Sequence, residues 1–223
     1  MMYLIGGPPR SGKTTLAKKL SSRLRIGWVS VDILESVVRE YTPKKNHPKL
    51  FPKNTLREKT GGSNDEMYER FSAREIAHAY ISQGKASMKA IETFVSDCVQ
   101  EGHDFVLEGH QIHPKLAQTL IERFPQDVRM VFLIKKDEQA LMEGFHKNSA
   151  KRDWVLQKTK QIETFQKIAK MLSYFGTYLE KEAAKYGFAV YCTDKDFLKT
   201  ISLVEKDMMR GETKITSLKI GQK

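Results

Sequence analysis

Short apolar segments alternate along the chain with longer segments in which apolar residues recur every three or four positions. The short segments are rich in Val, Ile, Leu and Phe, as buried strands are, whereas the longer ones are typical of amphipathic helices. The five predicted strands are Met2–Ile5, Gly27–Val31, Asp104–Glu108, Arg129–Lys135 and Gly187–Cys192. Strands that alternate with helices in this way predict one α/β domain with a doubly wound parallel sheet.

The helices are predicted from the same periodicity. They cover Lys13 to about Leu24, about Asp65 to Gln100 with a break near Gly84, about Glu138 to Phe145, and Ile162 to Ala183. We expect Trp154 to open and anchor the helix around 162–183. Asp194 is expected to cap a last helix that begins near Lys195.

The segment after the first strand matches G-x-x-x-x-G-K-[ST] and opens a helix, which is the context in which this pattern binds nucleotide phosphates. Gly7 and Gly12 allow a tight loop whose backbone N–H groups point inward, and the helix N-terminus adds partial positive charge. Lys13 would contact the β- and γ-phosphates of ATP, and the Thr14 hydroxyl would ligate Mg²⁺. The predicted nucleotide-binding residues are Gly7, Pro8, Pro9, Arg10, Ser11, Gly12, Lys13, Thr14 and Thr15.

Two acids at strand ends are candidates for the rest of a catalytic site. Glu108 ends the third predicted strand and Asp32 follows the second, and the carboxyl ends of parallel strands line the ligand crevice of such a sheet. Glu108 would face the phosphates and the metal. Asp32 has two interpretations, as a catalytic or substrate-contacting acid or as the N-cap of the helix that follows.

Composition narrows the class of protein. The 223 residues fit one domain with room for an insertion, and the net charge of +11 favours anionic partners. Two cysteines are too few for a disulfide framework and indicate a reducing compartment. No apolar run is long enough for a transmembrane helix and no secretory signal is apparent, so we expect a cytoplasmic protein without a membrane partner.

The positive charge is densest between Thr42 and Thr60, where Glu58 is the single acid. The basic residues there are Lys44, Lys45, Lys49, Lys53, Arg57 and Lys59. This segment is either a binding surface for an anionic acceptor or a solubilising loop. His110 and His113 lie beside Glu108, but Mg²⁺ avoids imidazole and two histidines with one acid do not define a zinc site.

Taken in order, the phosphate loop, Asp32, the turn Glu-Gly-His-Gln-Ile-His-Pro at 108–114 and the basic segment before the long helix resemble small P-loop phosphotransferases. The resemblance is in particular to the 2-phosphoglycerate kinase-like group, with the zeta-toxin-like and gluconate-kinase-like groups nearby. It extends from about Met2 to Val204. It implies a sheet of order 2-3-1-4-5 and an ATP-dependent transfer with Mg²⁺.

The resemblance also implies residue roles. Lys13 and Thr14 would lie at the triphosphate, Glu108 near the metal, and Asp32 would be the base for the acceptor hydroxyl or a ligand of a Mg²⁺-bound water. The basic lid would be Lys147, Lys151 and Arg152, with Arg152 counted among the catalytic residues. Arg39 and His110 complete the candidate substrate contacts.

The chain departs from the family pattern at two places. Glu35 stands where an arginine is common, three residues after the strand-2 acid, and Arg39 is the next basic candidate. Lysines replace some lid arginines and lose bidentate phosphate recognition. The expected organisation is a kinase domain over 1–206, with an insertion at about 42–101 and a lid at about 146–153, followed by a polar tail over 207–223.

The favoured function is an ATP-dependent kinase that phosphorylates a hydroxyl or phosphate of a small anionic acceptor. An alternative within the same chemistry is a nucleotide or nucleotide-sugar kinase of the zeta-toxin type. An alternative of another class is a nucleic-acid-binding ATPase or polynucleotide-end kinase, which the charge permits but which the absence of helicase-type motifs disfavours.

Overall fold

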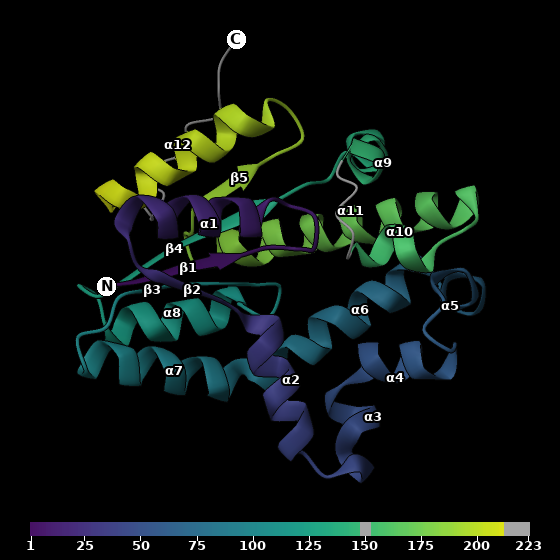
Figure 1. The fold of residues 1–223 in the computed structure, drawn as a ribbon, viewed down its shortest axis with the longest axis horizontal. Coiled ribbons are helices and arrows are strands. Elements are labelled where there is room, and N and C mark those ends of the chain that lie inside the picture. Colours follow the sequence, from purple (N-terminus) through teal and green to yellow (C-terminus); the bar gives the residue numbers. More distant parts are fainter. Residues whose placement is uncertain (148–152, 212–223) are drawn as a thin grey trace.

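The computed structural model describes residues 1–147 and 153–211, with the backbone alone for 146 and 147. Its strands are β1 (Met2–Gly6), β2 (Gly27–Ser30), β3 (Phe105–Gly109), β4 (Val128–Ile134) and β5 (Val190–Cys192). They form a parallel five-stranded sheet in the order β2-β3-β1-β4-β5 (Figure 1). The predicted fold class and strand order are therefore confirmed.

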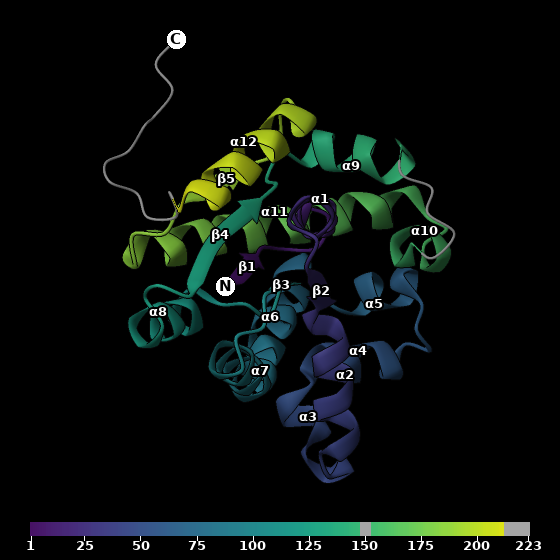
Figure 2. The same cartoon turned by 60° about the vertical axis from the view of Figure 1, so that its left-hand side comes forward.

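The described helices are α1 (Lys13–Leu24), α2 (Val31–Tyr41), α3 (His47–Leu50), α4 (Pro52–Lys59), α5 (Asn64–Arg70), α6 (Ala73–Gly84), α7 (Met88–Gln100), α8 (Pro114–Arg123), α9 (Glu138–Lys147), α10 (Trp154–Lys158), α11 (Ile162–Lys185) and α12 (Phe197–Arg210). Helices α2 to α7 connect β2 to β3, and α2 and α3 project from the sheet on the side away from α12 (Figure 2). The helical stretch predicted to end at Gln100 breaks at Gly84, as expected, and also between α5 and α6, where Ser72 starts a new helix with a capping box.

Two details at helix ends differ from the sequence-based expectation. Trp154 opens the short helix α10 rather than the long helix α11, because Asp65 accepts hydrogen bonds from the N–H groups of Lys160 (2.9 Å) and Gln161 (3.2 Å) and holds a turn between them. Asp194 does not cap α12, whose N-cap is Asp196.

The Asp194 carboxylate accepts instead from the backbone N–H groups of Lys136 (2.8 Å) and Asp137 (3.0 Å), and thereby ties the end of β5 to the end of β4. Helix α12 continues to Arg210, and its Met208 is buried in the core. The domain boundary expected at 206 therefore falls inside a packed helix.

The sheet is covered on both faces, as the alternation along β1 requires. Leu4 packs in a cluster with residues of α7 and α8, whereas Ile5 packs in another cluster with residues of α1 and α12. Both side chains are fully buried. The carboxyl ends of β1, β2 and β3 are thereby held in register beside the N-terminus of α1.

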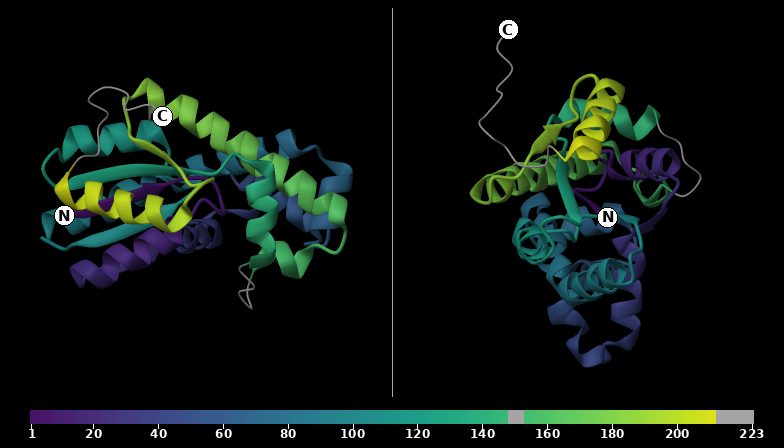
Figure 3. Two further views of the ribbon diagram at one scale, coloured as in Figure 1. Left: turned by 90° about the horizontal axis from the view of Figure 1, so that it is seen from above. Right: turned by 90° about the vertical axis from the view of Figure 1, so that its left-hand side faces the viewer.

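Helix α11 joins the sheet to a second, purely helical cluster. Its Leu179 and Ala183 pack against the sheet, whereas Ile168 and Phe175 pack against residues of α5, α6 and α9. Figures 1 and 3 show α11 extending past the strands to the short helices α5 and α10. Across the ranges that the structure describes, no helix combines the length and apolarity needed to cross a membrane.

The two isoleucines of α11 offer a matched test of this packing. Ile168 is fully buried whereas Ile162 is 69% exposed. We expect Ile168→Ala to lower the free energy of unfolding by about 2–5 kcal/mol, since it opens a cavity between α11 and α6. Ile162→Ala should change it by less than about 0.5 kcal/mol. Urea unfolding monitored by circular dichroism measures both, and equal effects would contradict the described packing.

Candidate active site

The loop between β1 and α1 has the backbone of a phosphate cradle. Gly7 (φ 152°) and Gly12 (φ 97°) have positive φ, and Arg10 (φ 69°) is also left-handed. A Cβ on Gly7 would lie 2.2 Å from the carbonyl oxygen of Leu133, and one on Gly12 would lie 2.6 Å from the Phe197 ring. No side chain caps the start of α1, so its first backbone N–H groups are free to bind an anion.

Lys13 is 7% exposed, and its Nζ donates to the carbonyl oxygen of Pro8 at 2.8 Å, across the loop. Burial lowers the pKa of Lys13, and the carboxylates of Glu108 and Asp32 offset part of this effect, so the pKa stays below its ordinary value. An anion placed against this ammonium would relieve the cost of its desolvation. The geometry therefore fits a lysine that binds phosphate.

Thr14 and Glu108 are brought together beside the loop. The Thr14 hydroxyl donates to Glu108 Oε1 at 3.1 Å, and Glu108 is 5% exposed. Hydroxyl and carboxylate oxygens are the hard donors that Mg²⁺ prefers. No cluster of three His, Cys, Asp or Glu side chains that could hold a metal ion occurs among the described residues. This pair therefore fits a Mg²⁺ ion that takes its remaining ligands from phosphate and water.

Asp32 is the second residue of α2 and not its N-cap, which is Ser30, and it makes no capping hydrogen bond. Its side chain is 66% exposed and lines the pocket that the phosphate loop also lines. Gln111 Nε2 donates to Asp32 Oδ1 at 2.7 Å, and His110 Nδ1 lies 3.5 Å from the same oxygen. The structure thus favours the site interpretation of Asp32 over the capping one.

The pKa of Asp32 reflects opposing effects. Desolvation raises it, but the contacts with His110 and the Gln111 amide, together with the ammonium groups of Lys53 and Lys13, outweigh desolvation and leave the pKa below its usual value. The carboxylate is therefore ionised at neutral pH. It can accept a proton from a bound hydroxyl.

His110 is buried and neutral. Burial and the nearby Lys53 and Lys13 lower the pKa of His110 to about 3, although Asp32 acts in the opposite direction. Its ring packs edge-on against Tyr80, with centroids 5.3 Å apart. His110 Nε2 is buried and has no hydrogen-bond partner within the described part of the chain. His113, by contrast, is paired with the hydroxyl of Tyr178 at 3.0 Å.

A buried carboxylate that the sequence analysis did not assign to the site lies next to Asp32. Glu35 is 5% exposed and accepts three hydrogen bonds. The donors are Lys53 Nζ at 3.0 Å, Gln83 Nε2 at 2.6 Å and Gln111 Nε2 at 3.1 Å. The acid that replaces the common arginine is therefore the centre of a polar network that reaches Asp32 through Gln111.

Two cations of α4 line the same pocket. Lys53 Nζ lies 5.3 Å from the centre of the Tyr80 ring, and the Arg57 guanidinium lies 4.9 Å from the centre of the Trp154 ring. Arg57 Nη2 also donates to the Tyr80 hydroxyl at 3.5 Å. The part of the basic segment that contains Lys53 and Arg57 thus faces the phosphate loop rather than bulk solvent.

The side chain of Arg10 connects the loop to α9 and α10. Its Nη1 pairs with the carboxylate of Asp153, which also accepts from the N–H of Val155 at 3.0 Å and so starts α10. The guanidinium lies 5.0 Å from the centre of the Phe145 ring. The position of the phosphate loop is thereby coupled to the end of α9 and the start of α10.

Together these residues enclose a pocket of about 390 Å³. The predicted site residues that line it are Pro9, Arg10, Lys13, Thr14, Asp32, Glu108 and His110. Arg39 is not brought to it. Arg39 pairs with Glu58 and lines a separate pocket with Lys44 and His47. The side chain of Lys147, and all of Lys151 and Arg152, lie outside the described residues.

The site residues predicted from the sequence do not include Glu35, Lys53, Arg57, Gln83, Gln111 or Trp154. Lys53 and Arg57 share a signal that could have found them, since both belong to the basic segment and lie four residues apart, on one face of a helix. The two glutamines carry no such signal. They are recognised by their contacts alone.

A parallel sheet of order 2-3-1-4-5 with a phosphate loop between β1 and α1 defines a P-loop fold of the kinase type. Curated proteins named 2-phosphoglycerate kinase from Methanopyrus kandleri and Pyrococcus horikoshii are 22% and 25% identical to the chain, over 97% and 96% of its length. The resemblance indicated by the motifs is thus confirmed across nearly the whole chain. The chain covers 64% and 66% of these two relatives.

No protein-family model matches the chain. Among solved structures, a gluconokinase from Sinorhizobium meliloti 1021 is 12% identical, with a TM-score of 0.49 and coverage of 95% of this chain and 93% of that one. This TM-score is too low for the likeness to bear on the function.

The buried, neutral His110 predicts a pH effect on stability. The pKa of His110 is about 3 in the folded protein and 6.5 for an ordinary histidine, so between these values the unfolded state binds a proton that the folded state does not. Stability is therefore lost as the pH falls from about 6.5 towards 3. In urea unfolding at a series of pH values, His110→Asn should reduce this slope by up to about 1.4 kcal/mol per pH unit. His103→Asn, at an exposed site, is the control, and equal slopes in wild type and His110→Asn would show that His110 does not titrate in this way.

Proposed function

We propose that this protein is an ATP-dependent kinase that transfers the γ-phosphoryl group to a hydroxyl or phosphate of a small anionic acceptor. The first acceptor to test is 2-phosphoglycerate, which the similar curated proteins are named for. One observation carries the proposal, namely that a single pocket holds the phosphate-loop residues Lys13 and Thr14 together with the ionised Asp32.

The chain's own groups account for most of the chemistry. Lys13 and the N-terminus of α1 would hold the phosphates of ATP, and Asp32 would take the proton of the acceptor hydroxyl. The hydroxyl oxygen then forms the new O–P bond, the bond from the γ-phosphorus to the bridging oxygen breaks, and ADP leaves. Mg²⁺, held by Thr14 and by Glu108 or Asp32 through water, would neutralise charge on the phosphates. The cations Lys147, Lys151 and Arg152 are proposed to form the lid that closes over them.

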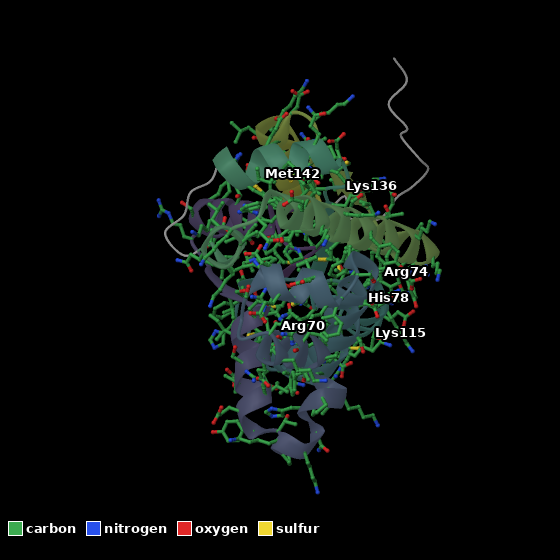
Figure 4. The ribbon with its side chains drawn as sticks, turned by 90° about the vertical axis from the view of Figure 1, so that its right-hand side faces the viewer. Arg70, Arg74, His78, Lys115, Lys136 and Met142 are labelled. Carbon is green, nitrogen blue, oxygen red and sulfur yellow. The ribbon has the colours of Figure 1, made fainter. Side chains whose placement is uncertain are left out.

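Some of the basic side chains on the surface are already paired with other groups of the chain. Figure 4 labels five basic or ionisable side chains spread over one face, Arg70, Arg74, His78, Lys115 and Lys136. Arg70 pairs with Glu66 at 3.1 Å, Lys136 pairs with Glu180 at 2.7 Å, and His78 contacts the Tyr174 hydroxyl at 3.0 Å.

The proposal is tested by incubating the protein with γ-labelled ATP, Mg²⁺ and separate acceptor pools. The pools are phosphorylated hydroxy acids, sugar acids, nucleosides, nucleotide sugars and RNA ends. Label should move to the phosphorylated hydroxy acids. Label that moves to RNA ends or nucleotide sugars would replace the proposed acceptor, and hydrolysis without transfer to any pool would contradict the kinase assignment.

Lys13→Ala should lower kcat by at least about 10²-fold, because the variant lacks the charge that faces the transferring group. The fold should be preserved, since the Lys13 side chain donates to one loop carbonyl and its desolvation opposes folding. Steady-state kinetics and thermal melting measure the two effects. Lys18→Ala, which removes an exposed lysine from the same helix, is the control. Wild-type turnover in a folded Lys13→Ala protein would show that the loop is not the phosphate site.

Asp32→Asn should lower kcat by about 10²–10⁴-fold and leave the affinity for ATP within about threefold, if Asp32 is the base for the acceptor. Asparagine can still accept the hydrogen bond from Gln111, so the local structure should persist. Asp97→Asn, at an exposed position on α7, controls for the loss of one negative charge. A variant with unchanged kcat and reduced stability would leave Asp32 as a structural residue.

A further inference from the structure

The wall of the pocket formed by α4 carries two cations with different partners. Lys53 Nζ lies 3.0 Å from Glu35 Oε1, and both side chains are largely buried. Arg57 has no carboxylate within ion-pair distance among the described residues. Its contacts are the Trp154 ring and the Tyr80 hydroxyl. The charge of Lys53 is thus balanced inside the protein, whereas that of Arg57 is not.

The Arg57 guanidinium is already held in one orientation. The central carbon of the guanidinium lies 4.9 Å from the centre of the Trp154 ring. One of its five N–H donors, on Nη2, donates to the Tyr80 hydroxyl at 3.5 Å. These two contacts leave other N–H donors of the guanidinium available for an oxyanion. Little side-chain entropy remains to be lost when a ligand binds, so the site is preorganised.

The other cations that line the pocket have assigned partners. Arg10 pairs with Asp153 and Lys53 pairs with Glu35, and Lys13 lies in the phosphate loop, where the nucleotide would bind. Asp32, Glu35 and Glu108 place three carboxylates on the same cavity. An anionic acceptor in such a cavity needs a cation to offset these acids, and among the described residues Arg57 lines the cavity without a carboxylate partner of its own.

We propose that Arg57 is the binding residue for the phosphate ester of the acceptor, with Lys53 as its second donor. This proposal rests on the proposed kinase function and adds the chemical class of the acceptor. A phosphate monoester carries nearly two negative charges at neutral pH, and an arginine fork beside an ammonium that keeps unused N–H donors matches it. Glu35 holds Lys53 in place, and Trp154 holds Arg57.

Ligand binding at Arg57 can be measured through the fluorescence of Trp154, which lies beside it. The chain has two tryptophans, so a Trp28→Phe background leaves Trp154, beside Arg57, as the single tryptophan fluorophore. The protein is titrated in the presence of ADP and Mg²⁺ with 2-phosphoglycerate, with glycerol 2-phosphate, which lacks the carboxylate, and with glycerate, which lacks the phosphate. Calorimetry repeats each titration without reliance on fluorescence.

The two phosphate esters should bind and glycerate should bind far more weakly. In Arg57→Ala the dissociation constants of both esters should rise roughly tenfold or more, with the affinity for ADP unchanged. Arg57→Lys should recover part of the loss, because it keeps the charge without the fork. Lys59→Ala removes an exposed cation from the same helix and should bind like wild type.

Unchanged ester affinity in Arg57→Ala would overturn the proposal. If Arg57→Ala loses the weak binding of glycerate but binds glycerol 2-phosphate like wild type, the proposal is overturned as well, since Arg57 would then recognise the carboxylate. The kinase function fails separately. If ester binding depends on Arg57 but no label moves from ATP, the subsite stands and the reaction is wrong. If wild type phosphorylates 2-phosphoglycerate and Arg57→Ala has the same KM, the reaction stands and the subsite is wrong.

Discussion

The carboxylate of Glu35 connects the segments of the chain that form the acceptor side of the pocket. It accepts hydrogen bonds from side chains of three different segments, α4, α6 and the turn after β3. A carboxylate that is 5% exposed is costly to desolvate, and the cost is tolerable because one of the three donors is an ammonium and the other two are amides. Removal of this acid would leave Lys53 without its acid and Gln111 without one of its two acceptors. The orientation of Asp32 therefore depends on a residue that does not need to touch a substrate.

A second connection crosses the pocket from the nucleotide side to the acceptor side. Arg10 of the phosphate loop pairs with Asp153, and the next residue, Trp154, supports the Arg57 guanidinium. Asp153 and Trp154 are adjacent in the chain, so a displacement of the loop would be transmitted to the cation on α4 through two contacts. Helix α11 stabilises this arrangement because its C-terminal half packs against the sheet and its N-terminal half packs against α5, α6 and α9.

The sequence predicts the fold and the nucleotide side well because their signals are local. The phosphate loop is one continuous motif, and the five strands are short apolar runs at the positions where the structure has them. Asp32 and Glu108 follow from strand ends, since the geometry of a parallel sheet brings those ends together. The helix boundaries near Trp154 and Asp194 were missed because each depends on a contact with a distant segment, by Asp65 in the first case and by the end of β4 in the second.

An acceptor surface was one of two interpretations of the basic segment that contains Lys53 and Arg57, but the polar network around Glu35 could not be predicted because its interactions span long stretches of sequence. Glu35 binds Gln83 and Gln111 across 48 and 76 residues, and no periodicity relates these positions. Arg39 was the basic candidate for a substrate contact because Glu35 stands where the family pattern commonly has an arginine. In the structure Arg39 lies towards the end of α2, where it pairs with Glu58.

The charges around Asp32 explain why one group in this pocket is suited to take a proton. A histidine beside an acid ordinarily becomes protonated and neutralises that acid, but here burial and two ammonium groups keep the pKa of His110 at about 3. The contact with His110, the hydrogen bond from the Gln111 amide and the same two ammonium groups together outweigh desolvation and leave the pKa of Asp32 below its usual value. Asp32 thus retains its full negative charge across the physiological pH range, with the neutral imidazole and the Gln111 amide fixing its position. The lysines that would bind the anionic groups of the substrates are therefore also among the groups that lower the pKa of Asp32.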